Sequence, residues 1–242
     1  MNFKKLITLS ITLILVSSCG LTYSVILGID TTPEWKTDEQ IAKQAKKYSI
    51  PTEYNLLLDT ASYKRELKHI YSEAKNVLKI NQSDSSDFTN LKKARNDDLQ
   101  PTQFRLFDQN GVEIFKLVNC YIDPPIPLKW NVNGCFDSFP PKTSIETLDI
   151  HMFPLEFLLS HTSNIHQQKF AYTGLPEAEY YGVILWNDYF KRPSRRLIKT
   201  VHEYMEKTDK PVTMIYINNH NQFLWSVMNS EEKEKVKISI RD

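Results

Sequence analysis

Two apolar runs decide the fold, YYGVILW at residues 180–186 and PVTMIYIN at residues 211–218. Each is short, rich in aliphatic and aromatic residues, and bounded by polar or proline-containing segments, which is typical of a buried strand. Pro193 stands between them and opens a stretch with apolar residues at helical spacing: Leu197, Ile198, Val201, Tyr204 and Met205. The pattern predicts a strand–helix–strand unit over residues 182–217.

A second strand–helix pair lies nearer the N-terminus. Residues 54–58 predict a short buried strand, and a helix is expected from about Ser62. Its apolar face comprises Leu67, Ile70, Tyr71, Ala74, Val77 and Leu78. The capping-box spacing of Thr37 and Gln40 predicts a further helix that ends before Pro51.

The middle of the chain predicts mixed secondary structure. Alternating apolar residues on both sides of Asn110-Gly111 predict a β-hairpin over 102–122. Residues 81–101 are polar and predict a surface loop with a short helix around 88–94. Residues 222–228 are expected to pair as a strand with the run at 211–218. Together these elements predict an α/β (or α+β) fold, with one mixed-sheet domain and flanking helices over residues 33–242.

The N-terminus has the pattern of an export signal. Lys4 and Lys5 precede an uncharged, mostly apolar stretch at 6–16, which is too short to span a bilayer as a helix. The following Val16-Ser17-Ser18-Cys19 resembles the lipobox of bacterial lipoproteins, in which an aliphatic and two small residues precede an invariant cysteine.

This resemblance implies that residues 1–18 are a removed signal peptide and that 19–32 form a tether. Cys19 would then carry diacylglycerol and a further acyl chain such as palmitate, enough for stable membrane anchoring. It implies residence in the bacterial cell envelope, with Gly20 favouring the outer membrane where the cell has one. An ordinary signal peptide and an uncleaved anchor are the alternatives.

Charge argues against nucleic acid as a partner. Removal of Lys4 and Lys5 leaves 28 basic residues against 29 acidic ones, so the mature chain has no large basic surplus. The sequence contains no phosphate-binding loop, dinucleotide fingerprint or Gly-x-Ser-x-Gly motif, and no cofactor is expected.

Two cysteines remain after lipidation, Cys120 and Cys135. They flank a proline-rich loop and would lie outside the cytoplasm, where disulfides persist. We predict a disulfide between them, worth about 3 kcal/mol in the chain-entropy model. Two thiols or a redox-active pair are the alternatives, and a metal site lacks further ligands nearby.

The strand–helix–strand unit also resembles the active strand and helix of thioredoxin-like proteins. An apolar strand, a Trp186 turn and a helix-opening Lys191-Arg192-Pro193-Ser194 stand where those proteins carry Cys-x-Pro-Cys. The hairpin at 102–118 is similar to one that precedes the domain in envelope members. Since no cysteine lies within 182–217, the resemblance implies a thioredoxin-like fold without dithiol exchange by this unit.

Three groups of side chains are candidate sites. Lys191, Arg192, Arg195 and Arg196 cluster near a predicted helix N-terminus and could bind an anion. His161 and His166 stand five apart, but the spacing supplies no third ligand, so no metal is expected. Aromatic side chains that could line a groove for glycan or peptide are Trp130, Trp186, Trp225, Tyr180, Tyr181 and Tyr189.

The expected function is that of a membrane-anchored, non-catalytic envelope lipoprotein that binds a protein, glycan or small molecule. The alternatives are an envelope enzyme, hydrolytic or redox-related, with a site assembled from distant segments, and a structural component of envelope assembly.

Lipidation gives the first testable prediction. When the full chain is expressed in bacteria fed labelled palmitate, the wild-type protein should be labelled, whereas Cys19→Ala should not, because the acceptor sulfur is gone. Cys120→Ala is the matched control and should keep the label. A labelled Cys19→Ala protein would contradict the assignment.

Overall fold

The computed structural model describes residues 28–30, 34–119, 129–142, 153–170 and 172–234. The strands are β1 (Asn55–Leu58), β2 (Gln103–Asp108), β3 (Glu113–Val118), β4 (Thr162–Ser163), β5 (Tyr180–Trp186) and β6 (Val212–Asn218). The α-helices are α2 (Asp38–Lys47), α3 (Thr60–Ile80), α4 (Ser85–Asp98), α5 (Leu155–Ser160), α6 (Lys191–Met205) and α7 (His220–Val227). Short 3-10 turns are η2 (Val132–Gly134) and η4 (Tyr172–Gly174).

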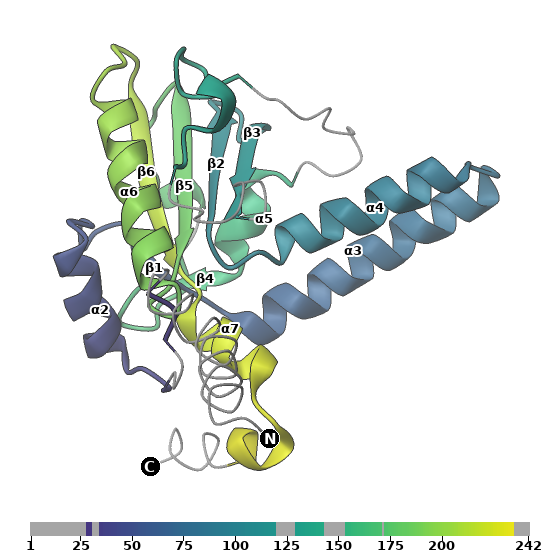
Figure 1. Cartoon of the computed structure of the whole chain (residues 1–242), viewed down its shortest axis with the longest axis horizontal. Helices are drawn as coiled ribbons and strands as arrows, with labels where there is room; N and C mark the ends of the chain where they lie inside the picture. Colours follow the sequence, from purple (N-terminus) through teal and green to yellow (C-terminus); the bar gives the residue numbers. More distant parts are fainter. Residues whose placement is uncertain (1–27, 31–33, 120–128, 143–152, 171, 235–242) are drawn as a thin grey trace, which may run out of the picture.

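The strands form one mixed sheet in the order β3-β2-β5-β6-β1-β4 (Figure 1). The three central strands β5, β6 and β1 run parallel, and the outer pairings are antiparallel. This arrangement confirms the predicted α/β class with a single mixed sheet and flanking helices.

The predicted strand–helix–strand unit is present as β5, α6 and β6. The two strands pair in continuous parallel register from Tyr180 opposite Val212 to Trp186 opposite Asn218. The helix begins at Lys191, two residues before the predicted start at Pro193. A proline is tolerated there because the first N–H groups of a helix have no intrahelical acceptor.

The predicted β-hairpin is also present, as β2 and β3. Its turn is fixed by Asp108, whose Oδ1 accepts hydrogen bonds from the backbone N–H groups of Asn110 and Val112, each at 2.9 Å. Gly111 has φ of 75°, a conformation that glycine adopts without strain.

Residues 81–101 were expected to be mainly a loop, and this prediction is wrong. They contain α4, which at 14 residues is longer than the predicted short helix. The side chain of Asp84 caps it by accepting from the backbone N–H groups of Ser86 and Asp87. Leu91 is buried in a cluster with residues of α3. A helix that packs along another helix therefore needs only a few apolar residues on the contacting face.

The predicted strand at 222–228 is likewise wrong, because these residues lie in or directly after α7. Both edges of β6 are already occupied, by β5 on one side and β1 on the other. No position remains for an antiparallel partner of β6, and the chain instead turns into a helix across the end of the strand.

Helices cover both faces of the sheet (Figure 1). One core contains residues of α2 and α6 with the loop around Trp130, packed on Phe104 and Trp186. The other contains residues of α3, α4 and α5, packed on Val183 and Ile217. The α3–α4 pair extends well beyond the sheet as a long helical hairpin (Figure 1).

A buried ionic network joins the end of α4 to the β2–β3 hairpin. Arg105 is fully buried and its guanidinium contacts Asp98 Oδ1 at 2.7 Å and Glu113 Oε1 at 3.4 Å. Lys116 Nζ also lies 2.6 Å from Asp98 Oδ1. Although burial opposes ionisation, the charges of Arg105 and Lys116 hold the pKa of Asp98 below its ordinary value, whereas burial raises the pKa of Glu113.

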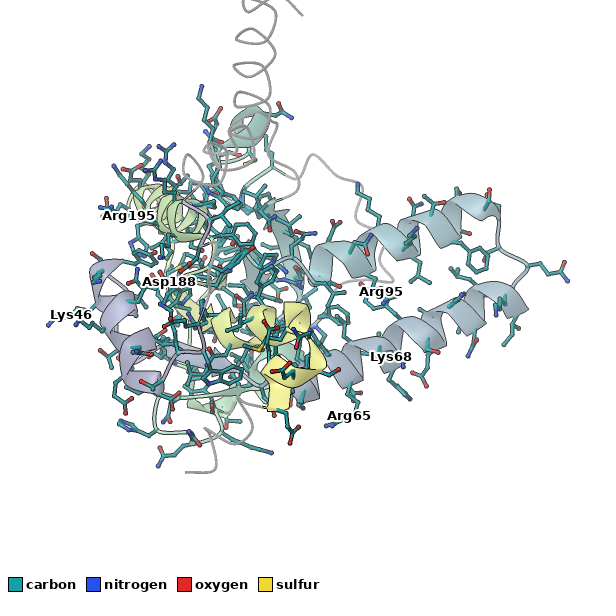
Figure 2. The ribbon with its side chains drawn as sticks, turned by 60° about the horizontal axis from the view of Figure 1, so that its bottom comes forward. Lys46, Arg65, Lys68, Arg95, Asp188 and Arg195 are labelled. Atoms are coloured by element: carbon teal, nitrogen blue, oxygen red, sulfur yellow. The ribbon has the colours of Figure 1, made fainter. Side chains whose placement is uncertain are left out.

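Arg105→Met should test the importance of this network. It leaves the Asp98 and Glu113 carboxylates buried with Lys116 alone, so we expect the free energy of unfolding to fall by about 3–5 kcal/mol in urea denaturation. The control is Arg95→Met, which removes an exposed cation of α4 (Figure 2). This variant should change the free energy of unfolding by less than about 0.5 kcal/mol. Equal stability of Arg105→Met and wild type would contradict the expectation.

Candidate functional site

The three parallel strands end at the same edge of the sheet, and polar residues follow each of them. Asp59 follows β1, Asn187 and Asp188 follow β5, and Asn219 and His220 follow β6. In open α/β sheets, ligands bind in crevices outside the carboxyl ends of the strands. This carboxyl edge is therefore the candidate functional site.

Two asparagines fix the centre of this edge. The side-chain amides of Asn187 and Asn219 donate to the carbonyl oxygen of Pro101, at 2.8 and 2.9 Å. Asn187 also donates to Asn219 Oδ1 at 3.3 Å. These bonds tie the loop before β2 to the ends of β5 and β6, so both asparagines have a structural role.

Residues 34–36 are fastened across the same edge. The side chain of Asn221 forms two hydrogen bonds with the backbone of Lys36: it donates to the carbonyl oxygen at 2.8 Å and accepts from the N–H at 3.0 Å. Lys36 Nζ forms a close ion pair with Asp188, and His220 Nε2 lies 2.9 Å from the Glu34 carbonyl oxygen. The segment that carries Trp35 is thus held beside α7.

An open cavity of about 590 Å³ lies between this segment, α3, β4 and α7. We call it the tryptophan cavity, since Trp35 and Trp225 line it with ring centroids 6.1 Å apart in an edge-to-face arrangement. Both rings are partly exposed. Polar lining residues include Asp38, Asp59, Ser62, His161, Gln167, Lys169 and Asn221.

Ser62 and His161 form a hydrogen-bonded pair in the tryptophan cavity, with Ser62 Oγ 2.8 Å from His161 Nδ1. Ser62 stands in the first turn of α3, whose N-cap Asp59 accepts from the Ser62 N–H at 3.0 Å. The His161 ring lies edge-on to Tyr63 and Phe157. Burial lowers the pKa of His161, so its imidazole is neutral at pH 7.

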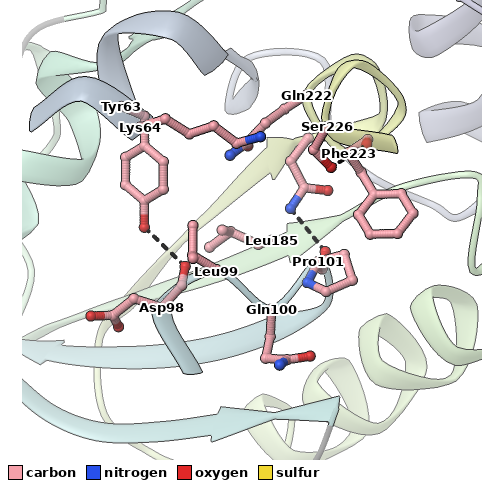
Figure 3. Close-up of a pocket in the computed structure, with 11 residues that line it drawn as sticks. Tyr63, Lys64, Asp98, Leu99, Gln100, Pro101, Leu185, Gln222, Phe223 and Ser226 are labelled. Atoms are coloured by element: carbon pink, nitrogen blue, oxygen red, sulfur yellow. Dashed lines mark hydrogen bonds between the residues drawn. The ribbon is translucent and has the colours of Figure 1, made fainter. Parts of the chain in front are cut away.

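A smaller cavity of about 160 Å³ lies on the other side of α7 (Figure 3). We call it the Lys64 cavity. Its lining is mostly apolar and includes Leu99, Pro101, Leu185 and Phe223, with polar groups from Lys64, Gln222 and Ser226 among others. The helix α7 thus forms a wall of two cavities of different character.

The predicted anion cluster lies on the outer side of α6. Lys191, Arg192, Arg195 and Arg196 are exposed, and Figure 2 shows Arg195 directed away from the sheet. Lys191 Nζ pairs with Asp30 Oδ2 at 3.1 Å. Neither the tryptophan cavity nor the Lys64 cavity includes these residues, so anion binding by them stays a prediction.

The cysteine predictions concern residues only partly described. Cys135 is buried, and its sulfur lies 3.8 Å from the Trp130 carbonyl oxygen. Cys19 and Cys120 lie outside the described residues, so lipidation and the disulfide stay predictions. Ser194, which stands in place of a thioredoxin-like cysteine, is buried in α6 and its Oγ accepts from the Asn187 N–H at 3.3 Å.

The predicted aromatic residues do not form one groove. Trp130 and Trp186 are 1% and 0% exposed, which places them in the core. Tyr181 is buried, and Tyr180 packs on Phe139. Tyr189 contacts Phe190 and Phe223. Of the six, Trp225 alone lines the tryptophan cavity.

The histidines are also separated. His161 is buried at the tryptophan cavity, whereas His166 is exposed. His202 on α6 is partly buried, and its Nε2 lies 2.5 Å from the hydroxyl oxygen of Tyr216. Within the described ranges, no three His, Cys, Asp or Glu side chains are grouped to hold a metal ion.

Comparisons with protein-family models, curated proteins and solved structures found no match. Among the helices that the structure describes, none has the length and apolarity needed to cross a membrane. A functional assignment therefore depends on the geometry of the carboxyl edge itself.

Sequence reasoning missed Trp35, Ser62 and Lys64 as site residues. One usable signal was present, because Asp59 follows a predicted buried strand and stands where a helix begins. A polar residue at that junction marks the carboxyl edge of a parallel sheet. The proximity of Trp35 to Trp225 depends on long-range packing and has no local signature.

His220 gives a prediction for pH dependence. It is fully buried, and burial lowers its pKa below the ordinary 6.5. As pH falls below 6.5, the unfolded chain therefore binds a proton that the folded chain excludes, and stability falls by up to about 1.4 kcal/mol per pH unit. His220→Gln should lose this part of the slope in urea denaturation at several pH values.

The control is His166→Gln, which removes an exposed imidazole from the segment after β4. It should preserve the wild-type pH slope between about pH 7.5 and 5.5. If His220→Gln kept the wild-type pH slope as well, His220 would not be the residue that causes the loss of stability at low pH.

Proposed function

We propose that this chain is a lipid-anchored binding protein of the bacterial envelope, and that the tryptophan cavity is its ligand site. The observation that carries the proposal is the cavity of about 590 Å³ at the carboxyl edge, lined by two partly exposed indoles and several polar side chains. Its volume lies within the usual range for small-molecule sites.

The lining favours a saccharide as ligand. The faces of Trp35 and Trp225 can pack against the C–H faces of a sugar ring, and the polar groups around them can bind its hydroxyls. Asp59 supplies a carboxylate acceptor and Lys169 an ammonium donor in the lining of the cavity. A neutral, polar ligand with apolar faces matches this mixture better than a purely apolar one.

The Ser62–His161 pair favours hydrolysis as the second candidate, because a serine beside a neutral imidazole is the arrangement from which nucleophilic catalysis starts. The surroundings weaken this candidate. His161 Nε2 is buried and makes no hydrogen bond with any residue the structure describes. An imidazolium formed during catalysis would therefore lack the third group that orients and stabilises it.

The anchor has a geometric consequence within this proposal. Residues 28–30 dock beside the start of α6, where Asp30 N donates to the Tyr189 carbonyl at 2.9 Å and Ile29 bridges Phe190. A lipid on Cys19 would be joined to this point by a segment that reaches at most about 30 Å. The carboxyl edge would thus be held near the membrane surface.

Binding can be tested through intrinsic fluorescence, because Trp130 and Trp186 are buried while Trp35 and Trp225 line the cavity. N-acetylglucosamine, galactose and maltose would be titrated into the protein. We expect a saturable change in emission with at least one sugar. Loss of ring stacking in Trp225→Ala should weaken the affinity by about tenfold or more.

Tyr172→Ala is the matched control, since it removes a partly exposed aromatic ring outside both cavities. It should bind as the wild type does. Absence of saturable binding for all three sugars, or unchanged affinity in Trp225→Ala, would contradict the saccharide assignment. Sugar or ester cleavage that disappears in Ser62→Ala would assign catalysis instead.

A further inference from the structure

The Lys64 cavity carries a second inference, independent of the tryptophan cavity. It is partly open to solvent, is lined by residues of α3, α7 and the loop before β2, and has a volume of about 160 Å³. A cavity of about 150 Å³ holds a benzene molecule in another protein. The Lys64 cavity is thus large enough for an organic molecule of a few carbon atoms.

Lys64 brings an uncompensated charge to this cavity. It is partly buried on α3, and no carboxylate in the described ranges forms an ion pair with it. Asp98 also lines the cavity, but its carboxylate is engaged by Arg105 and Lys116. Burial, followed by the charge of Lys233, lowers the pKa of Lys64, which is the expected effect where no anion compensates the ammonium.

Gln222 supplies an unsatisfied hydrogen-bonding group in the same place. Its side chain is 8% exposed, and Oε1 has no hydrogen-bond partner among the described residues. Both Lys64 and Gln222 line the cavity, and the polar ends of their side chains fall at the same part of it in the view of Figure 3. A buried amide oxygen without a hydrogen-bond donor is unfavourable. A ligand that fits this cavity would therefore supply a donor for Gln222 Oε1 and an anion for Lys64.

We propose that the Lys64 cavity binds a short 2-hydroxycarboxylate. The carboxylate would pair with Lys64 Nζ, and the neighbouring hydroxyl would donate to Gln222 Oε1. The small hydrocarbon part would lie against Leu185 and Phe223. Such a ligand satisfies both orphan groups at once, which neither a simple fatty acid nor a neutral alcohol does.

The test is equilibrium dialysis of the full chain, in detergent, against radiolabelled L-lactate, propionate and glycerol. Lactate should bind most tightly, propionate more weakly and glycerol least. Lys64→Met keeps the length of the side chain and removes the charge, so lactate affinity should fall by about tenfold or more. Lys68→Met changes an exposed lysine one turn further along α3 (Figure 2) and should bind lactate normally.

Gln222→Leu is the second variant, and it separates the two contacts. It should reduce lactate affinity to the level of propionate and leave propionate binding unchanged. Unchanged lactate binding in Lys64→Met, or no lactate binding below about 10 mM by the wild type, would overturn the proposal. Sugar titration of the same variants distinguishes this failure from failure of the tryptophan cavity.

Discussion

The parallel pairing of β5 with β6 is the constraint on which the rest of the molecule depends. Helices cover both faces of these strands, so most of the side chains within them are apolar. Parallel strands also require a crossover, which α6 provides, and they end together at one edge. The polar residues excluded from the strands, such as Asn187 and Asn219, therefore collect at that edge, where the chain can satisfy or expose them.

The buried ionic network determines how α3 meets this edge. Asp98 binds the helix at two points: its backbone carbonyl accepts from the Tyr63 hydroxyl at 3.1 Å and its carboxylate accepts from the Tyr71 hydroxyl. Arg105 holds Asp98 in turn. Ser62 and Lys64 flank Tyr63 in sequence, so the network that fixes Tyr63 also fixes a wall of each cavity. Such a network contributes more to geometry than to net stability, because desolvation offsets much of its attraction.

The sequence predicted those elements that local patterns encode. The runs at 180–186 and 211–218, the hairpin around Gly111 and the Thr37 capping box are all present as expected. The errors arose where tertiary context decides. The region around α4 is polar, but α3 supplies the surface on which Leu91 packs. Residues 222–228 are rich in strand-forming types, but β6 had no unpaired edge left for them.

The site was less predictable than the fold for the same reason. Its two cavities share α7, whose consecutive residues Asn221 and Gln222 face different cavities. A shared wall links the two sites thermodynamically only to the extent that ligand binding moves it. Two residues fix the first turn of α7 to the segment at 34–36. His220 contacts the Glu34 carbonyl oxygen, and Asn221 forms two hydrogen bonds with the Lys36 backbone. These contacts resist displacement of the helix, and we therefore expect ligands of the two cavities to bind nearly independently.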